Sequence, residues 1–206
     1  MTLHADAPAH DGPARIGPNA IIRVAEVLRA EAGEAATADL FRAAGLDHYL
    51  AAMPERMVDE TEVTALQQAL RATLGLPRAH EIAFAAGVRT ADYLLAHRIP
   101  RPVQWLLHIL PPLLAARVLL NAISRHAWTF AGSGSFTAET GRPVRVTIAR
   151  CPICRGATAQ EPLCDFYAGT FERLFRVLVH RRSRVTETSC EAKGGHACVF
   201  EIAWSR

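Results

Sequence analysis

Apolar residues recur at helical spacing through the first half of the chain. From Asn19 to Gly33 they fall at positions 21, 22, 24, 25, 27 and 28, which predicts a helix that ends before the glycine. The same spacing predicts further helices over Thr37–Ala44, from Thr61 to Leu74 and from Pro77 to His97. Two apolar helices follow, Val103–Leu110 and Pro112–Arg125, separated at a Pro-Pro pair where the first must stop. The front half is therefore predicted to be helical.

After residue 125 the period changes from helical spacing to alternation. Trp128–Phe136 and the run Val144, Val146, Ile148 predict a hairpin, and Leu163–Val179 returns to helical spacing. Val185–Cys190 and Ala197–Trp204 predict a second hairpin. Two hairpins separated by a helix favour an α+β fold, in which the helical N-terminal half packs on a four-stranded antiparallel sheet.

The domain organisation expected from this pattern is one compact unit. Residues 1–18 contain three prolines and few large apolar side chains, which is typical of a disordered tail. Residues 19–125 form the helical region, and residues 126–206 form an α+β region that carries a metal site. A chain of 206 residues, half of them hydrophobic, is long enough for a single substantial core.

All five cysteines of the chain lie in its last third. Cys151 and Cys154 form a Cys-Pro-Ile-Cys turn, which can direct two thiolates at one ion; the others are Cys164, Cys190 and Cys198. The cluster is interpreted as a metal site, with structural zinc as the first choice. An iron–sulfur cluster, redox pairs and plain buried thiols remain alternatives. Disulfides would need an oxidising compartment, and the first 18 residues lack the apolar segment of a signal peptide.

Charge and hydropathy narrow the classes of partner. The formal charge is only +3 and the chain has a single lysine, Lys193, so a general nucleic-acid binder is not expected. The most apolar window, Val103–Ile123, is interrupted by polar residues and prolines, so a transmembrane helix is not expected either. A helix pair that is apolar on more than one face predicts deep burial, a lipophilic ligand or a partner surface. The expected location is the cytoplasm, with the face of a photosynthetic membrane as the peripheral alternative.

The segment from Val185 to Ile202, VTETSCEAKGGHACVFEI, resembles the C-terminal motif of the vinyl-4-reductase domain family. Glu187, Cys190, Gly194, Cys198 and Phe200 occupy that motif. The run from Cys164 to Gly169 is similar to the family's cysteine and aromatic helix opening, and Trp128–Phe136 to its glycine-rich first strand. The resemblance implies a vinyl-4-reductase or Bet3-like fold and a homodimer.

The same resemblance implies a ligand set. In the related phenol-sensing domains zinc is held by three cysteines and an acidic residue, and Cys164, Cys190 and Cys198 match those three cysteines. Cys151 or Cys154 is expected to replace the carboxylate, and the sequence does not choose between them.

The front half extends the likeness to family members of bacteriochlorophyll biosynthesis, which are named for 4-vinyl (8-vinyl) reduction of protochlorophyllide. No G-x-G-x-x-G follows a strand, so no nucleotide site for a reductase is visible. The preferred hypothesis is a carrier or accessory factor for 8-vinyl reduction, which presents a Mg-tetrapyrrole intermediate, of the divinyl protochlorophyllide or Mg-protoporphyrin type, to biosynthetic enzymes. A reductase that uses an external reductant and a dimeric scaffold or small-molecule sensor are the alternatives. No catalytic residue is assigned.

A flat macrocycle needs an apolar slot, an imidazole for its metal and cations for its carboxylates. His108 or His126 is the candidate for Mg²⁺, and Arg117 and Arg125 are the candidates for the carboxylates. The candidate slot residues are Trp105, Leu106, Leu110, Leu113, Leu114, Trp128 and Phe130. The plainer alternative is that the histidines are surface residues and the apolar side chains are ordinary core.

Overall fold

The computed structural model describes residues 2–5 and 14–205, with side chains described from residue 14 onward. Its helices, in chain order, are α1 Asn19–Ala43, α2 His48–Ala51, α3 Glu60–Leu74, α4 Leu76–His97, α5 Arg101–Ile109, α6 Pro112–Arg125, α7 Trp128–Ala131 and α8 Asp165–Leu178, with a 3₁₀ turn η1 at Glu191–Lys193. Its strands are β1 Thr2–Ala5, β2 Arg15–Ile16, β3 Val58–Asp59, β4 Ser135–Glu139, β5 Val144–Ala149, β6 Arg184–Ser189 and β7 Cys198–Ala203.

The helical front half forms largely where the hydrophobic period predicts it. The two helices expected on either side of Gly33 form one element, α1, which is broken at that glycine by a backbone φ of 83° and ψ of 174°. An L-residue with a side chain rarely adopts such a positive φ, so the glycine permits the kink. At α3, Asp59 caps the helix by accepting a hydrogen bond from the Thr61 backbone N–H.

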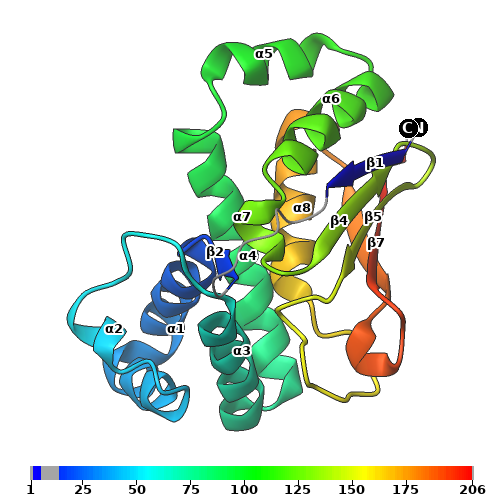
Figure 1. Ribbon diagram of the computed structural model, residues 1–206. Coiled ribbons are helices and arrows are strands. Elements are labelled where there is room, and N and C mark those ends of the chain that lie inside the picture. The colour runs from blue at the N-terminus through cyan, green and yellow to red at the C-terminus, as the bar shows by residue number, and fades with distance from the viewer. Residues whose placement is uncertain (1, 6–13, 206) are drawn as a thin grey trace.

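The predicted four-stranded antiparallel sheet is confirmed and gains a fifth strand. The order is β1-β4-β5-β7-β6, and every neighbouring pair is antiparallel. The helix α8 packs on one face of this sheet, and the helices α1, α3 and α4 lie beyond α8 (Figure 1). The core between α8 and the sheet is aromatic, with the Phe171 ring 6.5 Å from Phe136 and 5.7 Å from Phe200.

The helices α4 and α8 are in unusually close contact, and two glycines make this possible. A Cβ atom added to Gly87 of α4 would lie 2.1 Å from the carbonyl oxygen of Phe166, and one added to Gly169 of α8 would lie 2.3 Å from that of Phe84. The hydroxyl of Thr170 also donates a hydrogen bond to the Gly87 carbonyl oxygen at 3.1 Å. The backbones of the two helices therefore contact each other where the C-terminal half meets the front half.

Two local expectations were wrong. Residues 128–131 form the short helix α7 and not the start of a strand, and β4 begins only at Ser135. Gly132, at φ 59° and ψ −126°, turns the chain between the two. The expected disordered tail contributes β1, which pairs with β4, and β2, which pairs with β3; residues 1 and 6–13 of that tail lie outside the described residues. Backbone hydrogen bonding to an open strand edge accounts for β1, because it needs no apolar pattern.

Candidate metal centre

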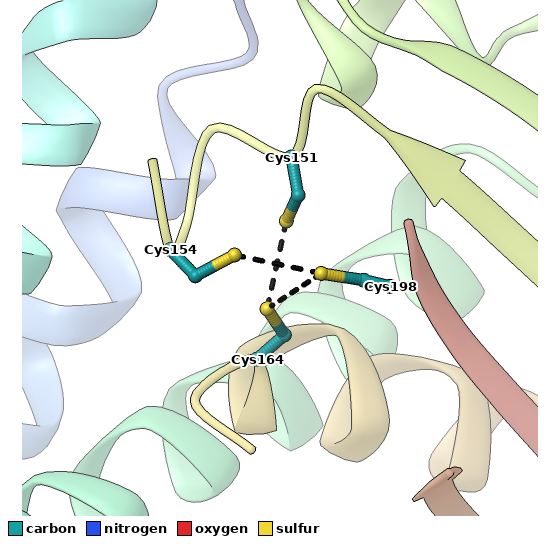
Figure 2. A group of neighbouring side chains, drawn as sticks. All are labelled: Cys151, Cys154, Cys164 and Cys198. Carbon is teal, nitrogen blue, oxygen red and sulfur yellow. Dashed lines mark hydrogen bonds between the residues drawn. The ribbon is translucent and has the colours of Figure 1, made fainter. Parts of the chain in front are cut away.

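Four cysteine sulfurs meet in the interior beside the start of α8 (Figure 2). The Sγ atoms of Cys151, Cys154, Cys164 and Cys198 all lie within 4.8 Å of one another, and all four residues are buried. The closest pairs are Cys154–Cys198 at 3.4 Å and Cys151–Cys164 at 3.5 Å. A disulfide needs about 2.05 Å between sulfurs. Tetrahedral zinc with bonds of about 2.3 Å separates its sulfurs by about 3.8 Å, so the donor set fits a metal ion.

Three elements distant in sequence bring these sulfurs together. Cys151 and Cys154 lie in the tight turn that follows β5, Cys164 is the residue before α8, and Cys198 is the first residue of β7. The β5 and β7 strands are neighbours in the sheet, with Ile148 paired to Cys198. An ion at this point would therefore tie the central strands to the helix that covers them.

Two carboxylates fix the backbone around the sulfurs. Glu191 accepts hydrogen bonds from the backbone N–H of Arg150 at 2.6 Å and of Cys151 at 2.9 Å. Glu187 accepts one from the backbone N–H of Cys164 at 2.9 Å. These contacts orient the first and third cysteines before any ion binds.

The fifth cysteine belongs to an overlapping set. Cys190 Sγ lies 3.9 Å from Cys198 Sγ, and Cys164, Glu187, Cys190 and Cys198 form a second group within 4.8 Å. The Oε1 atom of Glu187 is buried without a hydrogen-bond partner, and burial together with the nearby Cys190 raises the pKa of this carboxyl to about 9. Cys164 and Cys198 are common to both groups.

The environment of the sulfurs disfavours uncompensated negative charge. Burial raises the pKa of the Cys151 thiol, and that of the Cys164 thiol well above its usual range. Thiolate is nevertheless the form that binds a metal, and a divalent cation supplies the missing compensation. The chemistry of the four donors is thus that of a closed structural site rather than of an exposed reactive thiol.

The helix α3 holds the cysteine turn from outside, a contact that the sequence interpretation missed. Thr64 Oγ1 donates to the Pro152 carbonyl oxygen at 2.7 Å, and Gln68 Nε2 to that of Arg155 at 3.1 Å. Arg71 Nη1 donates to the Ile153 carbonyl oxygen at 3.3 Å. Positions 64, 68 and 71 recur at helical spacing and share one face, which is the only sequence signal for this contact.

The candidate tetrapyrrole residues are spread over α5, α6 and α7 and do not surround one buried slot. Trp105, Leu106, Leu114 and Trp128 are exposed; Leu110, Leu113 and Phe130 are partly buried; His108, His126, Arg117 and Arg125 are exposed. His108 Nε2 is 2.7 Å from the carbonyl oxygen of Val177, while His126 follows the last residue of α6. Phe130 joins the aromatic core, with its ring 5.5 Å from Phe136.

Comparisons with known proteins agree with this architecture. Residues 144–203, which include all five cysteines, match the family model of the vinyl-4-reductase domain. The chain is 45% identical over 206 residues to the bacteriochlorophyll synthase 23 kDa chain of Cereibacter sphaeroides, covering 98% of each chain. It is 40% identical over 202 residues to the protein of the same name from Rhodobacter capsulatus, covering 98% of this chain and 92% of the relative.

A solved structure shares the fold. An Fe(II) unliganded H-NOX protein mutant from K. algicida matches with a TM-score of 0.60 at 12% identity, over 93% of this chain and 97% of that one. At this identity the match shows a common fold and nothing further.

Proposed function

This chain belongs to the family of the bacteriochlorophyll synthase 23 kDa chains, the BchJ-type proteins, and from that membership we propose that it binds a Mg-tetrapyrrole intermediate as a carrier or accessory factor. Identity of 45% over nearly the whole length is the observation that carries the proposal. The chain thus takes part in bacteriochlorophyll biosynthesis. The finer proposal is that it presents a divinyl protochlorophyllide or Mg-protoporphyrin type of pigment to the enzymes of 8-vinyl reduction.

The junction of α6 and α7 is the proposed pigment site. His126 is exposed there and offers an imidazole for Mg²⁺, and Trp128, whose side chain is 45% exposed, offers an aromatic wall. Arg125 supplies a cation for a pigment carboxylate. Phe130 anchors this segment in the aromatic core. His108 is the weaker axial candidate, because its Nε2 atom already contacts the Val177 carbonyl oxygen.

Zinc is the proposed metal, and Cys151, Cys154, Cys164 and Cys198 would hold it. The ion would supply a structural crosslink between β5, β7 and α8, and no chemistry on the pigment. The support is the tetrathiol geometry and the burial of all four residues. An iron–sulfur cluster on the same cysteines is the less favoured occupant.

A pigment titration of the full-length, metal-loaded protein tests the function. We expect Mg-protoporphyrin to bind with one-to-one stoichiometry and a shifted Soret band, without loss of the vinyl group when dithionite is added. His126→Ala should weaken binding about tenfold, because it removes the axial ligand. The matched control, His97→Ala at the exposed end of α4, should leave the titration unchanged.

Each contrary outcome identifies an alternative. Vinyl reduction with a supplied reductant would make the protein a reductase and overturn the carrier proposal. No pigment binding, together with stable self-association, would make it a dimeric scaffold or sensor. Equal binding by wild type and His126→Ala would overturn the axial role of His126.

A further inference from the structure

The helix α5 presents its apolar side to solvent. Trp105 is 66% exposed, Ile109 59% and Leu106 44%, although these are the largest apolar side chains of the helix's outer face. A surface helix in a globular protein normally turns such residues toward the core. The arrangement in α5 is the reverse.

Hydrogen bonds to the main body fix this orientation. Gln104 Nε2 donates to the carbonyl oxygens of Leu95 at 2.6 Å and Ile99 at 2.8 Å, at the end of α4. His108 Nε2 contacts the Val177 carbonyl oxygen, at the end of α8, and Leu107 between them is 2% exposed. The residues at positions 104, 107 and 108 share the inner face, so Trp105, Leu106 and Ile109 are held on the outer one.

The apolar surface continues from α5 onto α6. Leu114 and Val118, one turn apart on α6, are 49% and 43% exposed, and Val103 of α5 is 40% exposed. The α5–α6 apolar face is defined here as Val103, Trp105, Leu106, Ile109, Leu114 and Val118. In Figure 1 α5 forms the top of the molecule, on the side away from α1, α2 and α3. An apolar face at one end of the molecule can contact a flat surface without obstruction by the rest.

The charge around this face has one sign. No Asp or Glu occurs between Asp92 and Glu139, and the same stretch contains four arginines: Arg98, Arg101, Arg117 and Arg125. Its formal charge is therefore more positive than the +3 of the whole chain. The complementary partner is a surface that is both apolar beneath and negatively charged on top, which describes an anionic lipid bilayer.

We propose that the α5–α6 apolar face docks on an anionic membrane surface, with α5 lying in the lipid interface. Trp105 would occupy the headgroup level, where tryptophan is favoured, and Leu106 and Ile109 would enter the acyl boundary. Arg98 and Arg101 would meet lipid phosphates. No described helix is long and apolar enough to cross a membrane, so the contact is one of lying on the surface. A second copy docked face to face would bring the arginines of both copies together, which like-charge repulsion opposes.

Vesicle binding by the full-length, metal-loaded protein tests this inference independently of any pigment. We expect sedimentation with vesicles of phosphatidylcholine and phosphatidylglycerol in equal parts, and little with phosphatidylcholine alone. Trp105→Ser combined with Ile109→Ser should lower the partition coefficient about tenfold or more. Arg98→Gln with Arg101→Gln should lower it about tenfold, whereas the control Arg42→Gln, an exposed residue at the end of α1, should change it less than about twofold.

A second measurement locates the contact. In a variant with Trp128→Phe and Trp204→Phe, Trp105 is the remaining tryptophan, and its emission should shift to the blue on anionic vesicles. Absence of vesicle binding overturns the proposal, as does binding that the α5 substitutions leave intact. A dimer in sedimentation velocity that Trp105→Ser dissociates, without vesicle binding, assigns the face to a second copy and also overturns it. None of these outcomes alters the pigment titration, so the two proposals fail separately.

Discussion

The guanidinium of Arg71 donates a hydrogen bond to the carbonyl oxygen of Ile153, inside the turn that carries two of the four clustered cysteines. Its Nη2 atom is buried without a hydrogen-bond partner. Burial lowers the pKa of the guanidinium, and the negative charge that the neighbouring cysteines can carry opposes that shift. Arg71 is therefore a buried cation beside a site whose bound form, four thiolates with one divalent ion, has a net charge of about −2.

Arg71→Gln is expected to weaken zinc binding about tenfold, because it removes this compensating charge and loosens the cysteine turn. Competition with a chromophoric chelator measures the dissociation constant. Arg71→Lys should recover part of the loss, since it restores the charge but not the fork of donors. Arg29→Gln, at an ion pair on α1 with Glu34, is the control and should bind as wild type does. Equal affinity in wild type and Arg71→Gln would contradict the electrostatic role.

The two overlapping donor groups make opposite predictions for single cysteine variants. If zinc occupies the four-cysteine group, Cys151→Ser and Cys154→Ser should lose most of the metal and Cys190→Ser should keep it. If it occupies the group with Glu187, Cys190→Ser and Glu187→Gln should lose the metal. Metal content of the purified variants, measured by atomic emission, separates the two cases. We expect the first pattern, because all four cysteines of that group are buried.

The sequence predicts that the cysteines converge, but not which four form the most compact group. The Cys-Pro-Ile-Cys turn and the family motif identify all five residues, because each lies at a strand or helix end that a local pattern can mark. The choice depends on where β6 ends relative to β7, and there the pairing register shifts between Glu187 and Ser189. A bulge of this kind moves Cys190 without leaving a clear mark in the hydrophobic pattern. The contact with α3 was missed for the same reason, since it joins residues more than 80 positions apart.

The glycines between α4 and α8 give a stability prediction. Gly169→Ala should lower the free energy of unfolding by about 3 kcal/mol, because the new methyl group would overlap the backbone at Phe84. Gly87→Ala should have a similar effect at the reciprocal contact with Phe166. Urea unfolding measures both, with Ala96→Ser on the exposed side of α4 as the control. Losses below about 1 kcal/mol in both variants would show that the helices can separate at little cost.

Element types were largely predictable, and the exceptions have local causes. The stretch from Trp128 to Ala131 alternates large and small residues over only four positions, too few to distinguish a strand from one helical turn. The outward orientation of α5 was also unpredictable, because its pattern is amphipathic whichever side faces the protein. Only the hydrogen bonds of Gln104 and His108 fix which side that is.

Glu60 gives a prediction for pH dependence. It is 6% exposed and accepts hydrogen bonds from Ser133 Oγ at 2.7 Å and Ser133 N–H at 2.8 Å, and it is ion-paired with Arg155. Burial alone would raise the pKa of this carboxyl, but the Ser133 hydrogen bonds and the Arg155 charge outweigh it and hold the pKa below its ordinary value of 4.5. A depressed pKa in the folded protein stabilises the fold above the unfolded value, and that contribution disappears as the pH falls through the folded value.

Glu60→Gln should therefore cost about 2 kcal/mol of unfolding free energy at neutral pH, since it breaks the ion pair and leaves buried donors facing each other. The gap between wild type and variant should stay constant down to about pH 5 and narrow below it as the wild-type carboxylate becomes protonated. Urea unfolding at a series of pH values measures the gap, with the exposed Glu55→Gln as the control. A gap that is the same at pH 7 and pH 3 would mean that the charge of Glu60 does not stabilise the fold, and that only its shape does.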